Sequence, residues 1–305
     1  MKALNAWIVV LLSALFFTAC NEDDEQPIKE KVQTEGTGVA NIYLTDAPAD
    51  NQEVAGVYIS INGIEAKGPN GWVAIKNYDE PVVINLLDYQ NGKSHFLSDE
   101  PIPAGTYSEL RMNLNIKDID GQSGQEGSYL EYKNGTKVSL FAPGGEGSDY
   151  KAIGGFTVKE NEDIDITMDF DVRKALVEAA QSEKMILKPA IRLVSNDRSG
   201  MLEGKVSGAE AFTKVVVLAY GNDSFSESEM DIKDGATRFA NAVSSTAVSA
   251  HGEFTLAYLT KGTYDLYFVM MDANGKFLNL LGTQQDVTIN ALGRTNMEID
   301  ITEIK

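Results

Sequence analysis

The chain has 305 residues and a formal net charge of −19, from 26 lysines and arginines against 45 aspartates and glutamates. So acidic a chain offers no basic stripe that could displace counterions from phosphates, and its composition excludes nucleic acid as a partner. The length suits one large domain or two ordinary ones. The 27 glycines, 12 tyrosines and 12 phenylalanines are typical of many short strands joined by tight turns.

Residues 1–19 have the features of a signal peptide. Lys2 precedes an apolar run from Trp7 to Phe17, which is shorter than the ~20 residues that a membrane-spanning helix needs. The run ends in the letters FTAC, which resemble the lipobox of bacterial lipoproteins. In that family the cysteine becomes the acylated N-terminus, so we expect Cys20 to anchor the protein in a membrane through its lipid. The alternative is a disulfide, which would have to join two chains because Cys20 is the only cysteine.

Residues 20–35 are predicted to form a flexible acidic tether, because a block of like charges cannot pack. The block consists of Glu22, Asp23, Asp24 and Glu25. It resembles the export signal that sends lipoproteins of the Bacteroidetes phylum to the outer face of the outer membrane. The resemblance implies an outer-membrane protein that faces the cell exterior, and the alternative is a tether that is merely solvated.

From residue 36 onward the hydrophobic period is two, as in strands with one buried face. Leu110, Met112, Leu114 and Ile116 alternate with polar residues, and so do the apolar residues of 164–172. Turn signals such as Asn-Gly separate these runs, as hairpins require. The pattern predicts an all-β fold with two β-sandwich domains in tandem, over 36–198 and 199–305, and one short helix near 171–181. The alternative to two domains is a long loop at 195–200 inside a single sandwich.

Six stretches of the first predicted domain resemble one known family. They are GVANIYLTDAPAD (38–50), VAGVYISINGIEA (54–66), GW (71–72), INLLDYQNG (84–92), LSDEPIPAGTYSELRMNL (97–114) and LKPAIRLV (187–194). Together they resemble the domain-of-unknown-function family 4382, which occurs at the N-terminus of bacterial lipoproteins. The resemblance implies a β-sandwich of unassigned function and supplies no catalytic residues.

The second predicted domain is similar to carboxypeptidase regulatory-like, transthyretin-type sandwiches. The similarity rests on LEGKVSG (202–208), HGEFTLAYLTKGTYDLYF (251–268) and the final strand TNMEIDITEI (295–304). These sandwiches are grouped with carbohydrate-binding-like folds. The similarity implies a fold and says little about a ligand, because a fold does not determine a function.

The residues that would support catalysis are sparse. His95 and His251 are the only histidines, and both lie near turn signals, so we expect surface residues rather than catalytic bases. No zinc-ligand spacing or phosphate-binding glycine loop occurs in the sequence. We therefore predict no catalytic residue, no metal, no cofactor and no enzymatic activity. A hydrolase with a carboxylate pair is the weakest of the alternatives.

Three groups of acids could instead be cation sites. Asp46 and Asp50 are predicted to shape a turn, with a cation site as the alternative. Residues 118–126 resemble a calcium loop imperfectly and are predicted to connect a hairpin. A ladder of four aspartates is predicted to pair with lysines and arginines of the same domain, with a bound divalent ion as the alternative. The ladder consists of Asp163, Asp165, Asp169 and Asp171, and the candidate cations are Arg111, Lys117, Lys188 and Arg192.

Ligand binding is the remaining class of function. Trp72 is the only tryptophan after the leader, and we expect it in the core. The alternative is that its flat aromatic ring is exposed for ligand recognition. Tyr129, Tyr132 and Tyr150 flank loops and are weaker candidates. The sequence thus predicts a non-catalytic cell-surface lipoprotein that recognises an extracellular glycan or protein. The alternative is a structural component of an envelope complex or appendage.

Overall fold

The fold is described from a computed structural model. It describes residues 36–47, 53–116, 127–143, 149–178, 185–208, 214–231, 237–272 and 275–304. All of them belong to one compact unit, Glu35–Lys305. These residues form strands almost throughout, with one short α-helix and three 3-10 turns, which confirms the all-β prediction. No helix in the described ranges is both long enough and apolar enough to span a membrane.

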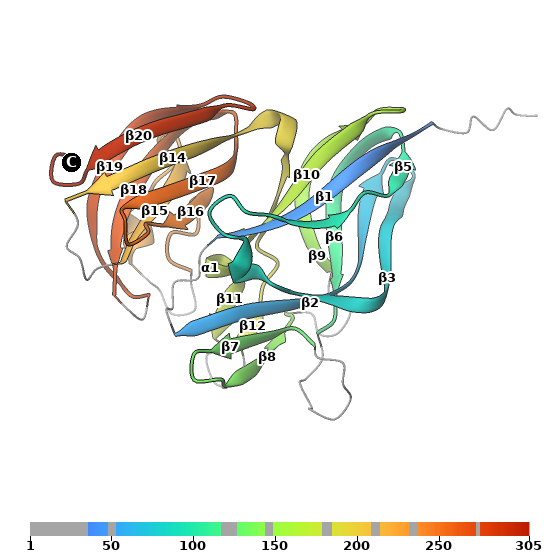
Figure 1. Cartoon of the computed structure of the whole chain (residues 1–305), viewed down its shortest axis with the longest axis horizontal. Coiled ribbons are helices and arrows are strands. Elements are labelled where there is room, and N and C mark those ends of the chain that lie inside the picture. Colours follow the sequence, from blue (N-terminus) through green and yellow to red (C-terminus); the bar gives the residue numbers. More distant parts are fainter. Residues whose placement is uncertain are drawn as a thin grey trace, which may run out of the picture. The chain divides into compact units, whose positions relative to one another are not determined.

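The strands before residue 196 form one sheet of 13 strands (Figure 1). Its order is β11-β12-β8-β7-β2-β6-β9-β13-β10-β1-β4, with β3 on the edge of β2 and β5 on the edge of β1. The strands are β1 (Thr37–Ala47), β2 (Val54–Gly68), β3 (Gly71–Asn85), β4 (His95–Ser98), β5 (Pro101–Pro103), β6 (Gly105–Leu114), β7 (Tyr129–Tyr132), β8 (Lys137–Phe141), β9 (Asp149–Val158), β10 (Asp163–Asp171), β11 (Leu176–Glu178), β12 (Met185–Leu187) and β13 (Ile191–Ser195). The 3-10 turn η1 (Leu86–Tyr89) follows β3, and η2 (Asn196–Arg198) follows β13.

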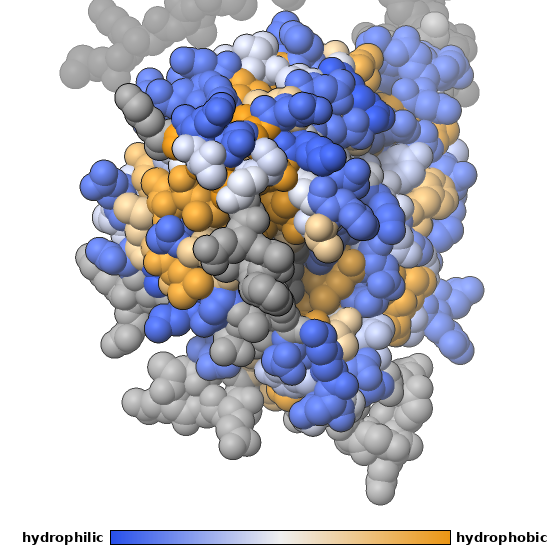
Figure 2. All heavy atoms as spheres, turned by 60° about the vertical axis from the view of Figure 1, so that its left-hand side comes forward, coloured by the Kyte–Doolittle hydropathy of each residue, from blue (hydrophilic) through white to orange (hydrophobic). Residues whose placement is uncertain are grey.

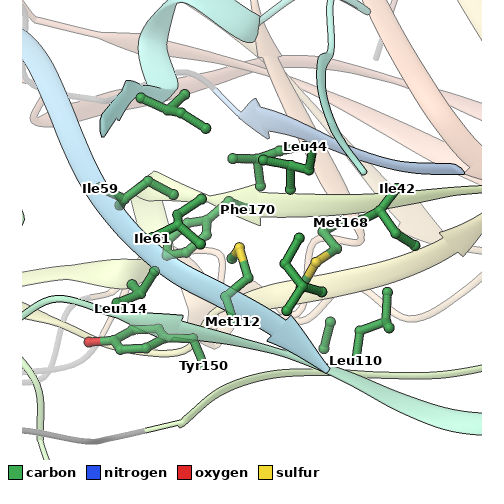
Figure 3. Packing of buried hydrophobic residues seen from close by; sticks show 14 of the residues in the cluster. Ile42, Leu44, Ile59, Ile61, Leu110, Met112, Leu114, Tyr150, Met168 and Phe170 are labelled. Carbon is green, nitrogen blue, oxygen red and sulfur yellow. The ribbon is translucent and has the colours of Figure 1, made fainter. Parts of the chain in front are cut away.

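The apolar residues that alternate with polar ones along these strands meet in a common core (Figure 3). Ile59 and Ile61 of β2 and Met112 of β6 face Leu44 of β1 and Phe170 of β10. All five side chains are fully buried. A buried side chain of this size stabilises the fold by about 1.5–3 kcal/mol. Because one face of these strands is committed to the core, the intervening residues of β2, β3, β6 and β9 must point outward.

The short helix expected near 171–181 is present, but it is confined to a single turn. The structure has a single turn, α1 (Val172–Ala175), and the chain then enters strand β11, which pairs with β12. The Asp171 side chain accepts a hydrogen bond from the Lys174 backbone N–H and caps that turn. Sheet pairing opposite Leu187 overrides the local helical preference of the residues that follow, as tertiary contacts commonly do.

The strands after residue 198 form two smaller sheets. One has the order β17-β14-β20 and the other β16-β15-β18-β19. The elements are β14 (Ser199–Ser207), β15 (Lys214–Gly221), η3 (Glu227–Met230), β16 (Ser244–Ala247), β17 (Glu253–Thr260), β18 (Gly262–Met271), β19 (Phe277–Ile289) and β20 (Arg294–Asp300). Strand pairing therefore changes at Ser199, next to the expected boundary. Whether each half folds independently stays a prediction.

Strand β15 is buried on both faces. Val217 packs into the core between the two small sheets, whereas Leu218 and Tyr220 belong to a separate apolar cluster on the opposite face. Figure 2, which brings these C-terminal strands forward, shows apolar patches between hydrophilic residues. One exposed apolar side chain of this region is Leu278 of β19, which is 49% exposed.

Two arginines of the N-terminal half of the chain donate to carbonyl oxygens of the C-terminal half. Arg192 Nη1 donates to the Tyr258 carbonyl at 2.8 Å. Arg173, which is almost fully buried, donates to the carbonyls of Arg238 at 2.6 Å and Phe239 at 3.2 Å. Two guanidinium nitrogens of Arg173 thus have main-chain acceptors, whereas its buried Nε has no hydrogen-bond partner among the described residues. Hydrogen bonds of this kind offset part of the cost of burying a charged group.

Candidate ligand-binding face

Nine outward-pointing side chains of β3, β2, β6 and β9 lie on one face of the 13-stranded sheet. The strand register places Lys67 beside both Trp72 and Glu109, and it places Arg111 beside both Glu65 and Lys151. Cross-strand partners point to the same side of a sheet, so these side chains share one face. We call it the Trp72 face. It consists of Glu65, Lys67, Trp72, Glu109, Arg111, Asn113, Asp149, Lys151 and Ile153.

Arg111 is held at the centre of this face by two carboxylates. Its Nε donates to Glu65 Oε2 at 2.5 Å, and its Nη1 donates to Asp149 Oδ2 at 2.8 Å. Glu65 also accepts a hydrogen bond from Asn113 Nδ2 at 3.2 Å. The hydrogen bond from Arg111 lowers the pKa of Glu65, and the same bond raises the pKa of Arg111. The guanidinium is therefore charged and fixed in orientation.

The Trp72 ring lies against this guanidinium. Arg111 Cζ is 4.1 Å from the ring centroid, which is a stacking distance. Glu65 and Asp149 hold the guanidinium from β2 and β9, the strands on either side of β6, so it lies along the surface of the sheet. The ring is half-buried, so part of it is exposed at the surface of the sheet. Trp72 is therefore a surface residue, which corrects the expectation of a core position.

Two lysines and an isoleucine complete the surroundings of the ring. The amino groups of Lys67 and Lys151 lie 5.9 and 5.8 Å from the ring centroid. Lys67 donates to Glu109 Oε1 at 2.8 Å, and this bond lowers the pKa of Glu109. Within the described ranges Lys151 makes no ion pair. Ile153 is 78% exposed.

The two glutamates of the Trp72 face are not poised for proton transfer. The pKa values of Glu65 and Glu109 lie below their usual range because cations donate hydrogen bonds to them. A general acid needs a pKa raised toward the working pH, so neither carboxyl is suited to that role. The face combines a rigid aromatic ring, a fixed arginine and an exposed apolar side chain, which is the composition of a recognition surface.

The three tyrosines proposed beside Trp72 do not join it. Tyr150 is 1% exposed and its hydroxyl donates to the Leu187 carbonyl, so its ring offers no face to a ligand. Burial raises the pKa of Tyr150. Tyr129 is buried and stacks on Tyr58 at 4.5 Å. Tyr132 is half-buried and packs against the core. They belong to strands or strand ends whose inward positions the core requires.

Asp46 is neither a surface turn residue nor an open cation ligand. It lies at the end of β1, is 5% exposed, and accepts a hydrogen bond from the Val172 backbone N–H at 3.1 Å. Burial raises its pKa well above the usual value, and the charges of Asp171 and Asp169 act in the same direction. Asp50, like residues 118–126, lies outside the described ranges.

Three of the four aspartates of the ladder have a side-chain partner nearby. Asp169 pairs with the cross-strand Arg192 at 2.5 Å, which confirms one predicted pair. Asp171 pairs with Lys174 at 3.1 Å within its own turn, and Asp165 accepts from Asn41 at 2.8 Å. In the part of the chain that is described, no group of three or more histidine, cysteine, aspartate or glutamate side chains is placed to hold a metal ion.

Neither histidine belongs to the strands of the Trp72 face. His95 begins β4, and its Nδ1 lies 2.8 Å from the Tyr89 hydroxyl. Burial lowers the pKa of His95. His251 lies exposed in the turn before β17, as expected. Cys20 and the acids Glu22, Asp23, Asp24 and Glu25 lie outside the described residues.

The sequence drew attention to Trp72 but not to its neighbours. The alternation with Leu110, Met112 and Leu114 predicts that Glu109, Arg111 and Asn113 face outward, and they do. Their proximity to Trp72 depends on β2 and β6 lying between β3 and β9, which no sequence pattern in this chain specifies.

Comparison with family models identifies residues 37–189 as a "Domain of unknown function (DUF4382)". The chain belongs to this family. The Trp72 face lies entirely within the matched residues. The expected similarity of the C-terminal strands to transthyretin-type sandwiches is not shown by any family match. No curated protein matches the chain.

Solved structures similar to this chain include pilins and a fimbrial anchor protein. The Bacillus anthracis TIE protein is 12% identical with a TM-score of 0.21, and the match covers 86% of this chain but only 34% of that one. BcpA*(D312A), the major pilin subunit of Bacillus cereus, is 10% identical with a TM-score of 0.23 and coverages of 87% and 70%. The fimbrial anchor protein Mfa2 from Porphyromonas gingivalis is 12% identical with a TM-score of 0.21 and coverages of 86% and 90%. At these TM-scores the likeness supports no inference about function.

Proposed function

We propose that this protein is a non-catalytic lipoprotein of the cell surface that recognises an extracellular glycan or protein through the Trp72 face. The observation that carries the proposal is the stack of Trp72 on Arg111, with Cζ 4.1 Å from the ring centroid. Two carboxylates fix the arginine, so the ring is held in place before any ligand arrives. Such preorganisation lowers the entropy lost on binding.

The Trp72 face suits an extended ligand better than a small molecule. Small-molecule sites are concave and enclose most of the ligand surface. The Trp72 face instead runs across four strands, from β3 to β9. Neighbouring strands lie about 4.8 Å apart, so a ligand that spans the face is a polymer or another macromolecule.

The proposed location at the cell surface rests on the N-terminal residues. Lipidation of Cys20 would place the anchor next to Glu22, Asp23, Asp24 and Glu25, whose charge opposes contact with anionic lipid. Residues 21–35 can span roughly 50 Å when extended. A face carried at that distance from the outer membrane is free to meet ligands outside the cell.

The test is a binding screen on residues 21–305 with Trp72→Ala. Truncating an aromatic anchor at the centre of a contact commonly costs about 2 kcal/mol or more, so we expect the variant to lose binding to any ligand found. Phe96→Ala is the matched control, because Phe96 is an exposed aromatic on the distant strand β4. Full binding by Trp72→Ala would contradict the proposed site.

The second candidate is a structural component of an envelope complex or appendage. The observation that favours it is β19, a strand of 13 residues at the end of its sheet order, with Leu278 49% exposed. A strand at a sheet edge is a template for adding a strand from another chain. Analytical ultracentrifugation of residues 21–305 distinguishes the candidates, since self-assembly that Leu278→Lys abolishes would favour the structural role.

A further inference from the structure

The charges of the Trp72 face cancel. Three cations, Lys67, Arg111 and Lys151, stand against three anions, Glu65, Glu109 and Asp149. The chain as a whole carries −19, so this balance is local. At physiological ionic strength the Debye length is ≈ 8 Å, and distant charges of the chain are largely screened from a ligand seated on the face.

We propose that the ligand of the Trp72 face is an uncharged glycan chain. This inference rests on the proposed function and narrows it from glycan or protein to one class. It follows from the balance of charge, from the partly exposed ring of Trp72, and from the mixture of hydrogen-bond donors and acceptors around the ring.

An acidic glycan does not match these groups. Each of the three carboxylates already accepts a hydrogen bond from a cationic side chain. An added ligand carboxylate would stand beside them, and like charges that close repel. A cationic ligand is equally mismatched, because all three cations lie within 5.9 Å of the ring centroid.

An uncharged sugar, by contrast, has hydroxyl groups and C–H groups that can all contact complementary groups on the Trp72 face. Its hydroxyl groups both donate and accept. The free lone pairs of Glu65 and Asp149 can accept, and the amino group of Lys151 can donate. The flat side of a sugar ring is covered with C–H groups, and the electron-rich face of Trp72 is complementary to them. Hydrogen bonds to charged groups contribute more free energy than bonds between neutral groups, so a few of them suffice to hold the sugar.

The position of Ile153 extends the contact beyond one sugar. Ile153 lies on β9 opposite Glu109, on the far side of β6 from β3, and is 78% exposed. A ligand that covers both the Trp72 ring and Ile153 crosses more than one strand spacing of about 4.8 Å. We therefore expect affinity to rise from a monosaccharide to short oligosaccharides of the same sugar.

The experiment uses residues 21–305 and six polysaccharides, by affinity electrophoresis followed by calorimetry. The neutral probes are laminarin, xyloglucan, mannan and starch, and the acidic probes are polygalacturonate and alginate. The expected result is binding to at least one neutral probe and to neither acidic probe. Between about 50 and about 500 mM salt the affinity should change by less than about twofold, because no net charge is neutralised on binding.

Two variants test the residues. Trp72→Ala should weaken binding about tenfold or more. Lys151→Met, which removes a donor that makes no ion pair in the described structure, should weaken it about threefold without loss of thermal stability. Phe96→Ala should bind as the parent chain does.

The outcomes separate this inference from the proposed function. Failure of all four neutral probes to bind would overturn the inference, and so would binding that weakens steeply with salt. If Trp72→Ala abolishes binding to an acidic glycan or to a protein, the ligand class is wrong but the Trp72 face remains the recognition site. If the variant leaves every observed interaction intact, the proposed function fails as well.

Discussion

The Asp46 carboxylate accepts a hydrogen bond from the backbone N–H of Val172 at 3.1 Å, across 126 positions of the chain. The bond joins the end of β1 to the first residue of α1. Asp46 is fully enclosed, and burial is the main reason that its pKa is raised well above the usual value. One buried carboxyl thus couples the geometry of this corner to pH.

The sign of the coupling follows from the raised pKa. The folded state holds the Asp46 proton more tightly than the unfolded state, so the contribution of this group is fully present below the unfolded pKa of about 3.9. It is lost as the pH rises through the folded value. We expect Asp46→Asn, which keeps an acceptor oxygen, to raise the unfolding temperature at pH 7 and to flatten its pH dependence above pH 4.

Calorimetry across a pH series measures this effect. Asp163→Asn on the exposed start of β10 is the control, and it should leave the profile unchanged. Asp46→Ala should instead destabilise the fold by about 1–3 kcal/mol, because the Val172 N–H is left buried without an acceptor. A pH profile of Asp46→Asn identical to that of the parent would contradict the buried, protonatable carboxyl.

Arg192 is expected to contribute to stability because it links two partners at once. It pairs with Asp169, whose side chain is 10% exposed, and donates to the Tyr258 carbonyl. Arg192→Met should lower the free energy of unfolding by about 2 kcal/mol, since it leaves the Asp169 charge poorly compensated. Urea titration measures the change.

The surface pair between Arg294 and Glu203 provides the control for Arg192. Its side chains are 60% and 33% exposed, so Arg294→Met should cost less than about 1 kcal/mol. Equal losses in the two variants would mean that burial of the Arg192 pair does not matter.

Tyr150→Phe tests the assignment of that tyrosine to the core. The hydroxyl donates to the Leu187 carbonyl at 2.8 Å in a buried setting, so the variant should lose about 1–2 kcal/mol of stability. Ligand binding should not change, because the ring is covered. Reduced affinity with unchanged stability would return Tyr150 to the binding site.

Gly204→Ala is expected to destabilise the C-terminal strands severely. A Cβ there would lie 2.2 Å from atoms of the Phe254 ring, which is 3% exposed and has no room to move aside. Overpacking of a core typically costs about 1–3 kcal/mol or more. Gly105→Ala is the matched control, because nothing lies within 4 Å of the added atom. Thermal unfolding compares the two, and similar midpoints would refute the close approach.

Surface display is tested on intact cells. Cys20→Ser should remove the protein from the membrane fraction, because the lipid would have no attachment site. Replacing Glu22, Asp23, Asp24 and Glu25 by alanine should leave it membrane-bound but protected from added protease. Equal protease sensitivity of this variant and the parent would show that the four acids do not direct export.

The sequence by itself determined the class of fold and the orientation of individual strands. In β6, Leu110, Met112 and Leu114 are buried, and Glu109 and Arg111 point outward, as the alternation predicted. This succeeds because side chains of a strand alternate with a period of two whatever the strand pairs with. The family resemblance over the first domain is confirmed for the same reason, since it rests on local stretches.

Tertiary structure alone decided which residues meet. The helix expected near 171–181 stops after Ala175 because the next residues pair with β12. Tyr150 is buried because it lies beside Met112 on the side of β9 that faces the core. The Trp72 face likewise exists only through the order β3-β2-β6-β9, which brings Arg111 to Trp72 from another strand. Alternation states which side of a strand a residue occupies. Strand order and register, which long-range pairing sets, determine which residues lie next to it on the neighbouring strands.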